Sequence, residues 1–192
     1  MARVLIPLAD GVEEMEAVII IDVLRRAGWS VTSAAVGASR RVHASRGVVI
    51  EADAEWDAVR PDAFDAILIP GGMGGTRCLA GHDGVKDAVR THRRQGNLVG
   101  AICAGPLVLQ AAGILDGRRA TCHPAVRDEL TAPLAVTDDP VVCDGLLLTS
   151  QGPGTAFDFA LAAIEALDGH AAAATVRAGL VLPPRPAGSE LS

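Results

Sequence analysis

The chain has 192 residues, a formal net charge of -6 and a hydrophobic fraction of 49%. This length and apolar content suit one compact domain with a large core and argue against disorder. The acidic balance argues against nucleic-acid and anionic-membrane partners, because both require a basic patch. No apolar stretch has the length of a signal-peptide core or a transmembrane helix, so we expect a cytoplasmic protein with no membrane partner.

The predicted elements alternate between strand and helix along the chain. Strands are predicted over residues 3–8, 29–36, 66–69, 97–102, 119–122 and 145–149, with a hairpin over 42–51. Helices are predicted over residues 12–27, 83–94, 107–115, 155–167 and 171–178. This alternation predicts a mostly parallel sheet with helices on both faces. We expect one domain over residues 1–182 and a flexible, proline-rich tail over 183–192.

The chain contains four widely spaced cysteines. They are Cys78, Cys103, Cys122 and Cys143, and none forms a Cys-x-x-Cys pair. Neither a zinc site nor a disulfide framework is indicated by this spacing. We therefore expect free thiols, no metal and no cofactor.

Cys103 stands where a predicted strand meets a predicted helix. The segment Ala101-Ile-Cys-Ala-Gly-Pro106 resembles a nucleophile elbow, in which small residues permit a sharp turn that exposes the reactive side chain. A helix N-terminus beside the sulfur favours a thiolate, so we expect the pKa of the thiol to be lowered. A buried cysteine at a tight packing point explains the local motif about equally well.

Three further segments follow predicted strands and converge on the same sheet edge. The backbone N–H groups of Gly72 and Ala104 are candidates for an oxyanion hole, although a plain turn explains the glycines alone. Glu16 is a candidate protonated partner of the thiol, since two neighbouring groups cannot both ionise cheaply. His123 is a candidate general base. The other four histidines are better explained as surface or capping residues.

Seven segments in one order resemble the ThiJ/PfpI superfamily, in the branch of the parkinsonism-associated protein deglycase and bacterial YajL. They are residues 11–16 (GVEEME), 22–28 (DVLRRAG), 45–46 (SR), 68–72 (LIPGG), 101–106 (AICAGP), 123–124 (HP) and 148–155 (LTSQGPGT). The resemblance implies a flavodoxin-like three-layer α/β sandwich, similar to class I glutamine amidotransferases, that forms a homodimer.

The resemblance also implies roles for individual residues. Cys103 is the oxidation-sensitive nucleophile, Glu16 its protonated partner and His123 the nearby base, with Gly72 and Ala104 as backbone donors. Arg26 and Arg46 match positions placed near the site across the dimer, where they bind an anion. Gln151 stands where the parkinsonism-associated protein carries an arginine, so anion binding is expected to be weaker.

These roles lead to a cofactor-independent glyoxalase or deglycase as the first hypothesis. Its partners would be small dicarbonyls such as methylglyoxal and glyoxal, or their early protein adducts. The alternative is a redox-sensing stress protein or chaperone that functions without turnover. A cysteine peptidase is a distant third, because no acidic partner for His123 is evident in the sequence.

Overall fold

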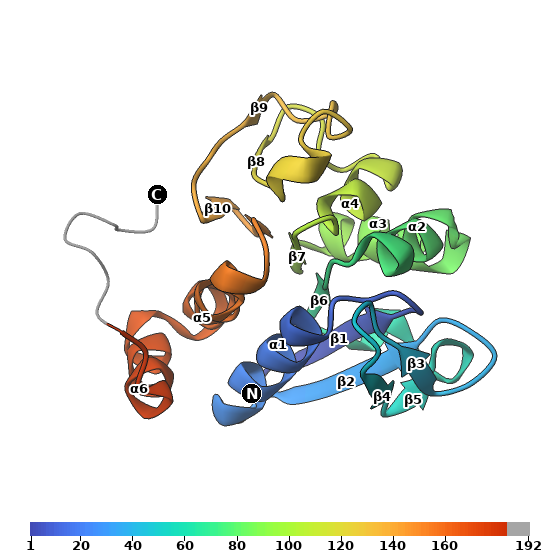
Figure 1. The fold of residues 1–192 in the computed structure, drawn as a ribbon. Helices are drawn as coiled ribbons and strands as arrows, with labels where there is room; N and C mark the ends of the chain where they lie inside the picture. The colour runs from blue at the N-terminus through green and yellow to red at the C-terminus, as the bar shows by residue number, and fades with distance from the viewer. Residues whose placement is uncertain (184–192) are drawn as a thin grey trace.

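The computed structural model describes residues 1–183, and its central feature is a sheet of seven strands in the order β10-β11-β7-β6-β1-β2-β5 (Figure 1). All neighbouring strands of this sheet run parallel except β10 and β11, which pair antiparallel. The strands are β1 (Arg3–Leu8), β2 (Ser30–Ala35), β5 (Ala54–Glu55), β6 (Ala66–Ile69), β7 (Leu98–Ile102), β10 (Val141–Asp144) and β11 (Leu147–Ser150). The mostly parallel sheet predicted from the sequence is confirmed.

Helices cover both faces of this sheet. They are α1 (Glu14–Arg26), α2 (Met73–Gly81), α3 (Asp83–Gln95), α4 (Pro106–Ala111), α5 (Ala156–Asp168) and α6 (His170–Leu180). Two small strand pairs lie outside the sheet: the hairpin β3 (Arg41–His43) with β4 (Val49–Glu51), and β8 (Arg119–Ala120) with β9 (Ala135–Val136).

Alternating residues of the central strands divide the core into two layers. Ile6 and Leu68 belong to the layer packed under α1, α5 and α6, whereas Leu5 and Ile67 belong to the layer under α2, α3 and α4. Side chains alternate between the two faces of a strand, so a run of apolar residues serves both layers. The result is the three-layer α/β sandwich that the sequence predicted.

The structure differs from the predicted elements in one helix and in several short strands. Helix α2 was not predicted, because its Gly74 and Gly75 have low helix propensity. Both glycines lie against the backbone of residues 9–12, where a Cβ on Gly75 would come within 3.0 Å of the Val12 nitrogen. The predicted strand over 119–122 is shorter and pairs outside the main sheet with β9, which was not predicted. The two edge strands of the main sheet, β5 and β10, were not predicted either. Most of the predicted tail, residues 184–192, lies outside the described residues.

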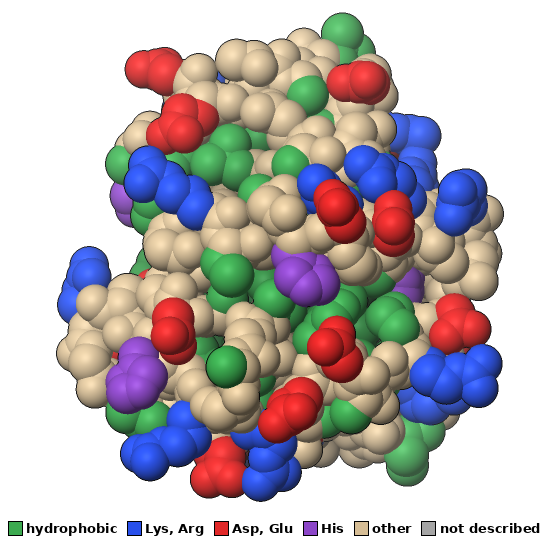
Figure 2. Space-filling view, turned by 90° about the vertical axis from the view of Figure 1, so that its right-hand side faces the viewer, with side chains coloured by type: hydrophobic (Ala, Val, Ile, Leu, Met, Phe, Trp, Pro, Cys, Tyr) green, Lys and Arg blue, Asp and Glu red, His purple; other side chains and the backbone are tan. Residues whose placement is uncertain are grey.

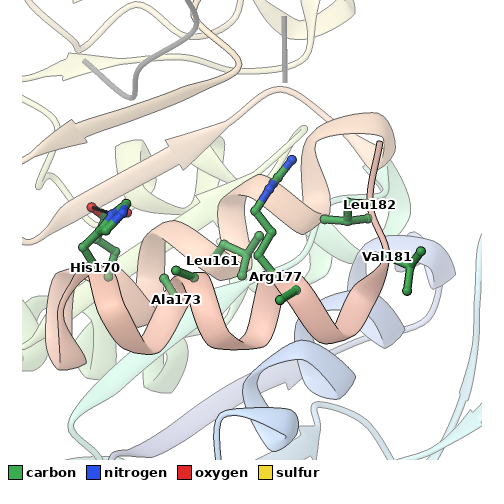
Figure 3. Close-up of a pocket in the computed structure, with 9 residues that line it drawn as sticks. Leu161, His170, Ala173, Arg177, Val181 and Leu182 are labelled. Atoms are coloured by element: carbon green, nitrogen blue, oxygen red, sulfur yellow. Dashed lines mark hydrogen bonds and ion pairs between the residues drawn. The ribbon is translucent and has the colours of Figure 1, made fainter. Parts of the chain in front are cut away.

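A cavity of about 410 Å³ lies between α5 and α6 (Figure 3). His170 and Arg177 project from α6 at this cavity, and each is paired with an acidic residue of α5, Glu165 and Asp158 respectively. None of the predicted site residues lines it. Among the described residues, no helix combines the length and apolar character needed to span a bilayer.

Candidate functional site

Cys103 occupies a strained turn directly after β7. Its φ of +63° lies in the left-handed region, which is uncommon for a residue with a side chain. Two backbone hydrogen bonds hold this conformation: the Cys103 N–H donates to Ser150 O at 2.9 Å, and the His123 N–H donates to Cys103 O at 2.9 Å. The turn geometry expected of a nucleophile elbow is therefore present, with α4 beginning three residues later at Pro106.

Glu16 reaches this turn from the first helical turn of α1. Its side chain is fully buried, and the Gly71 N–H donates to Glu16 Oε2 at 2.6 Å. In return, the Glu13 N–H donates to Gly71 O at 3.0 Å. The start of α1 and the turn after β6 are thus joined by a reciprocal pair of hydrogen bonds. The second oxygen of the carboxyl, Oε1, is buried with no hydrogen-bond partner among the described residues.

Glycine is required at positions 71 and 72 by close contacts. A Cβ on Gly71 would lie 2.5 Å from Cys103 Cβ and 2.7 Å from Glu16 Oε2. A Cβ on Gly72 would lie 2.3 Å from Gly11 O, and Gly72 also has a φ of +88°. Both positions therefore exclude a side chain, which lets the backbone approach the sulfur. The sequence pattern makes both glycines candidate backbone donors and favours Gly72 as the oxyanion donor, whereas in the structure the Gly71 N–H donates to Glu16.

The thiol and the carboxyl form a coupled pair. Burial and the neighbouring Glu16 raise the pKa of the Cys103 thiol to about 12, against the backbone N–H groups of Gly72 and Ala104, which lower it. Burial raises the pKa of Glu16 to about 7, against its hydrogen bonds with Gly71 and Cys103. The expectation of a lowered thiol pKa is therefore wrong for the pair at rest: desolvation and the adjacent carboxylate outweigh the donors. The thiolate is disfavoured while Glu16 is ionised.

His123 lies beside the cysteine through its main chain. It is the N-cap of a short 3-10 turn, Pro124–Val126, and its Nδ1 accepts a hydrogen bond from the Ala125 N–H at 3.1 Å. The Cδ2 edge of the ring packs near Gly152, where a Cβ would lie 3.3 Å away. The predicted cluster of Cys103, Glu16, Gly72, Ala104 and His123 is thus assembled by segments that follow β1, β6, β7 and β8.

The two predicted arginines do not join this cluster within one chain. Arg26 lies at the far end of α1 from Glu16 and donates to Asp22 Oδ2 at 2.6 Å. Arg46 lies in the exposed turn of the β3–β4 hairpin, where its main chain donates to Glu14 Oε1 at 2.8 Å. Gln151 donates to Asp138 O at 3.1 Å. A role for either arginine at the cysteine requires a second copy of the chain, as the resemblance implied.

The other histidines have structural roles, with one correction to the sequence analysis. His82 caps α3 by accepting from the Val85 N–H at 3.3 Å. His92, expected at the surface or at a helix end, is instead fully buried on the inner face of α3, with Nδ1 2.9 Å from Ala88 O.

The face shown in Figure 2 mixes acidic, basic and histidine side chains around apolar ones.

A three-layer α/β sandwich with a strained cysteine and a buried glutamate at the carboxyl edge of its sheet defines a cysteine-centred member of the flavodoxin-like class. Comparison with known proteins specifies the family. The family model described as "DJ-1/PfpI family" matches residues 2–166, and the chain belongs to this family.

Three relatives illustrate the similarity. Protein dj-1beta of Drosophila melanogaster is 41% identical over 179 residues, covering 93% of this chain and 96% of the relative, and its crystal structure matches with a TM-score of 0.91. "Glutathione-independent glyoxalase DJR-1.2" of Caenorhabditis elegans is 41% identical and covers 88% of this chain and 89% of the relative. A structure titled "Toxoplasma gondii DJ-1, oxidized" matches at 40% identity with a TM-score of 0.90, covering 94% of this chain and 98% of that one.

Proposed function

We propose that the protein is a cofactor-independent glyoxalase or deglycase that converts methylglyoxal, glyoxal or their early protein adducts through the Cys103 thiol. The observation that carries this proposal is the pairing of Cys103 with Glu16 at a strained, half-buried turn. A glyoxalase name borne by a relative at 41% identity supports the same reaction class.

The first step is addition of the sulfur to the aldehyde carbon of the substrate. A carboxylate whose pKa is about 7 is a suitable general base near neutral pH. Glu16 takes the thiol proton as the bond between Sγ and carbon forms, and the carbonyl π electrons move to oxygen. The N–H groups of Gly72 and Ala104, which already lie near the sulfur, stabilise the oxyanion. Glu16 then returns the proton to that oxygen and leaves a hemithioacetal.

The second step moves a proton between two carbons. A base, Glu16 or His123, removes the proton from the carbon bonded to sulfur and leaves an enediolate. The hydroxyl proton on that carbon passes to the oxygen of the neighbouring carbon, and the base returns its proton to the neighbouring carbon as the thioester carbonyl forms. The product of this internal redox step is a thioester of a 2-hydroxy acid. Water hydrolyses the thioester and releases lactate from methylglyoxal, or glycolate from glyoxal, together with the free thiol. The whole reaction adds one water and needs no external oxidant or reductant.

Redox sensing is the second candidate function of the same thiol. Cys103 is partly exposed, and a sulfinic acid formed on it would sit between Glu16 and the Gly72 and Ala104 N–H groups. The oxidised state named for the Toxoplasma gondii structure supports this candidate. A peptidase is less well supported, because a nucleophile–base pair needs a third group that orients the histidine. No acidic side chain contacts the His123 ring among residues 1–183.

We also propose that the protein is a cytoplasmic homodimer. Apolar side chains are exposed on α1 and on the neighbouring hairpin: Met15, Val18, Val48 and Val49 are 55%, 51%, 49% and 43% exposed. The two elements are joined by the hydrogen bonds of Glu14 to Ser45 and Arg46. A second copy covering this face would bring Arg46 to an interface. Sedimentation of the wild type as a dimer, and of Val18→Glu as a monomer, is the expected result.

The deciding experiment is lactate formation from methylglyoxal, measured with purified wild type and Cys103→Ser. We expect multiple turnovers by the wild type and none above background by the variant. Consumption of one methylglyoxal per thiol without lactate would refute the enzyme and favour redox sensing. Titration with hydrogen peroxide and mass spectrometry of Cys103 tests the second candidate separately.

A further inference from the structure

One ring nitrogen of His123, Nδ1, is held as a hydrogen-bond acceptor. Its Nδ1 accepts the Ala125 N–H at 3.1 Å, so this nitrogen carries a lone pair rather than a proton. The local sequence produces this contact, because Pro124 has no N–H and Ala125 supplies the first donor of the following turn. In a neutral imidazole the proton then resides on Nε2.

A histidine that acts as a base needs the opposite arrangement. It accepts a proton on one nitrogen while the other N–H donates to a carboxylate or a carbonyl that stabilises the imidazolium. At His123 the second nitrogen faces an N–H donor instead. Forming the imidazolium would place two hydrogens between Nδ1 and the Ala125 nitrogen and break that bond. No acidic side chain contacts this ring in the described part of the chain to compensate.

Glu16 has the properties that His123 lacks as a proton carrier. Its carboxyl is fully buried and interacts with the Gly71 N–H, which donates to Oε2, and with the Cys103 thiol. The other oxygen, Oε1, has no hydrogen-bond partner within residues 1–183 by distance and angle. That free oxygen can take up and release a proton without losing any existing hydrogen bond. The two candidate bases therefore differ in what protonation costs each of them.

We propose that His123 is a neutral hydrogen-bond donor through Nε2–H, and that Glu16 alone carries the protons of the reaction. This proposal rests on the proposed function, which left the two residues as alternatives. In the second step, Glu16 removes the proton from the carbon bonded to sulfur and delivers it to the oxygen on the neighbouring carbon. It then takes the hydroxyl proton from the first carbon, which leaves the thioester carbonyl there, and delivers that proton to the neighbouring carbon. Nε2–H donates to the oxygen on that neighbouring carbon as charge develops there, and keeps its own proton throughout.

The tautomer can be measured without any turnover. Long-range ¹H–¹⁵N correlation spectra of uniformly ¹⁵N-labelled protein at pH 7.5 distinguish protonated from unprotonated ring nitrogens. The chain has five histidines, so the signals missing from His123→Gln assign His123. We expect an unprotonated Nδ1 and a protonated Nε2. A protonated Nδ1 at this pH would overturn the proposal, whatever the protein catalyses.

Kinetics then test the role of the donor. His123→Gln retains an N–H donor, whereas His123→Leu is the matched variant without one. We expect His123→Leu to lose about 10²–10³-fold in kcat, as for the loss of one donor to a developing oxyanion, and His123→Gln to retain at least about tenfold more activity than His123→Leu. The pH inflection near 7 should persist in His123→Gln. Equal losses in both variants, or an inflection that disappears with His123, would identify the histidine as the base.

The two proposals fail differently. If the wild type forms no lactate, the proposed function fails, and the spectra alone decide the polarity of the ring. If lactate forms but Glu16→Gln stays active while both His123 variants are inactive, the enzyme stands and the donor role is overturned.

Discussion

Glu14 and Glu16 lie two residues apart in the first turn of α1, both are buried, and their carboxyl groups titrate in opposite directions. Burial raises the pKa of Glu14, but hydrogen bonds from its own N–H, from Ser45 and from the N–H groups of Arg46 and Val48 more than offset this, and its pKa is lowered. Glu16 has one backbone donor, and burial raises its pKa to about 7. The helix N-terminus is common to both, so the number of donors decides which carboxyl keeps its charge. One acid anchors the hairpin, and the other remains available for proton transfer.

The largest expected effect is a loss of catalytic activity on substitution of Glu16 but not of Glu14. Glu16→Gln keeps the shape and an acceptor for the Gly71 N–H but cannot exchange protons, so kcat/KM for lactate formation should fall by about 10²–10⁴-fold. Glu14→Gln, the matched control, should stay within a few-fold of wild type, because the Glu14 carboxyl accepts its hydrogen bonds from Ser45 and Arg46 of the hairpin. Similar losses in both variants would show that the acids act through the fold of α1 rather than through chemistry.

The second effect is on stability. The folded state holds a proton on Glu16 up to about pH 7, whereas the unfolded chain releases it near the ordinary glutamate pKa of 4.5. The free energy of unfolding contributed by Glu16 is therefore fully present below pH 4.5 and is lost as pH rises to about 7, by up to about 3 kcal/mol. Glu14 has the opposite sign, because its pKa is lowered.

Urea denaturation at pH 5 and pH 8 measures this difference. Glu16→Gln should gain stability relative to wild type on going from pH 5 to pH 8. Glu14→Gln should change little relative to wild type over this range, because the contribution of Glu14 is lost only as pH falls below about 4.5. Equal pH dependence of wild type and Glu16→Gln would show that burial of Glu16 costs nothing when it ionises.

A smaller effect is expected in the pH–rate profile. In the proposed mechanism Glu16 reacts as the carboxylate, so kcat/KM should fall about tenfold per pH unit below pH 7 and level off above it. Initial rates of lactate formation between pH 5 and 9 provide the profile. A rate that rises as pH falls would mean that the protonated acid is the form required in the free enzyme.

The smallest effect concerns the hairpin. Glu14→Gln replaces a charged acceptor by a neutral one at the Arg46 N–H and the Ser45 hydroxyl. We expect faster amide hydrogen exchange at Arg46 with no change at Gly71. Faster exchange at both amides would show that the two contacts open together.

The sequence was sufficient to predict most of the fold and the position of the site. Apolar runs such as residues 66–69 predict the strands, and the small-residue turn at Cys103 predicts where a strand ends. Neighbouring parallel strands bring such carboxyl ends together at one edge of the sheet. Helix α2 could not be predicted, because tertiary contacts of Gly74 and Gly75 override their low propensity.

The electrostatics of the site could not be predicted in the same way. The sequence places Cys103 beside a helix N-terminus, which favours a lowered pKa, but burial and Glu16 raise it. The tautomer of His123 likewise depends on a hydrogen bond seen only in three dimensions, although the His-Pro pair and the following N–H could have indicated it. The sequence pattern predicts which residues lie at the site. The burial of each titratable group and the number of its hydrogen-bond donors depend on the assembled structure.

The bond from the Cys103 N–H to Ser150 O has a consequence for the order of assembly. Cys103 leaves the ribosome well before Ser150, and its partner Glu16 is 87 positions earlier in the chain. The Cys103 N–H can make this bond only after β11 has added beside β7, so the left-handed turn has both of its backbone hydrogen bonds only then. During synthesis the sulfur is therefore an ordinary thiol on an incomplete sheet. Its special environment arises late, as a product of folding across nearly the whole chain, and a truncated chain that ends before β11 would lack it.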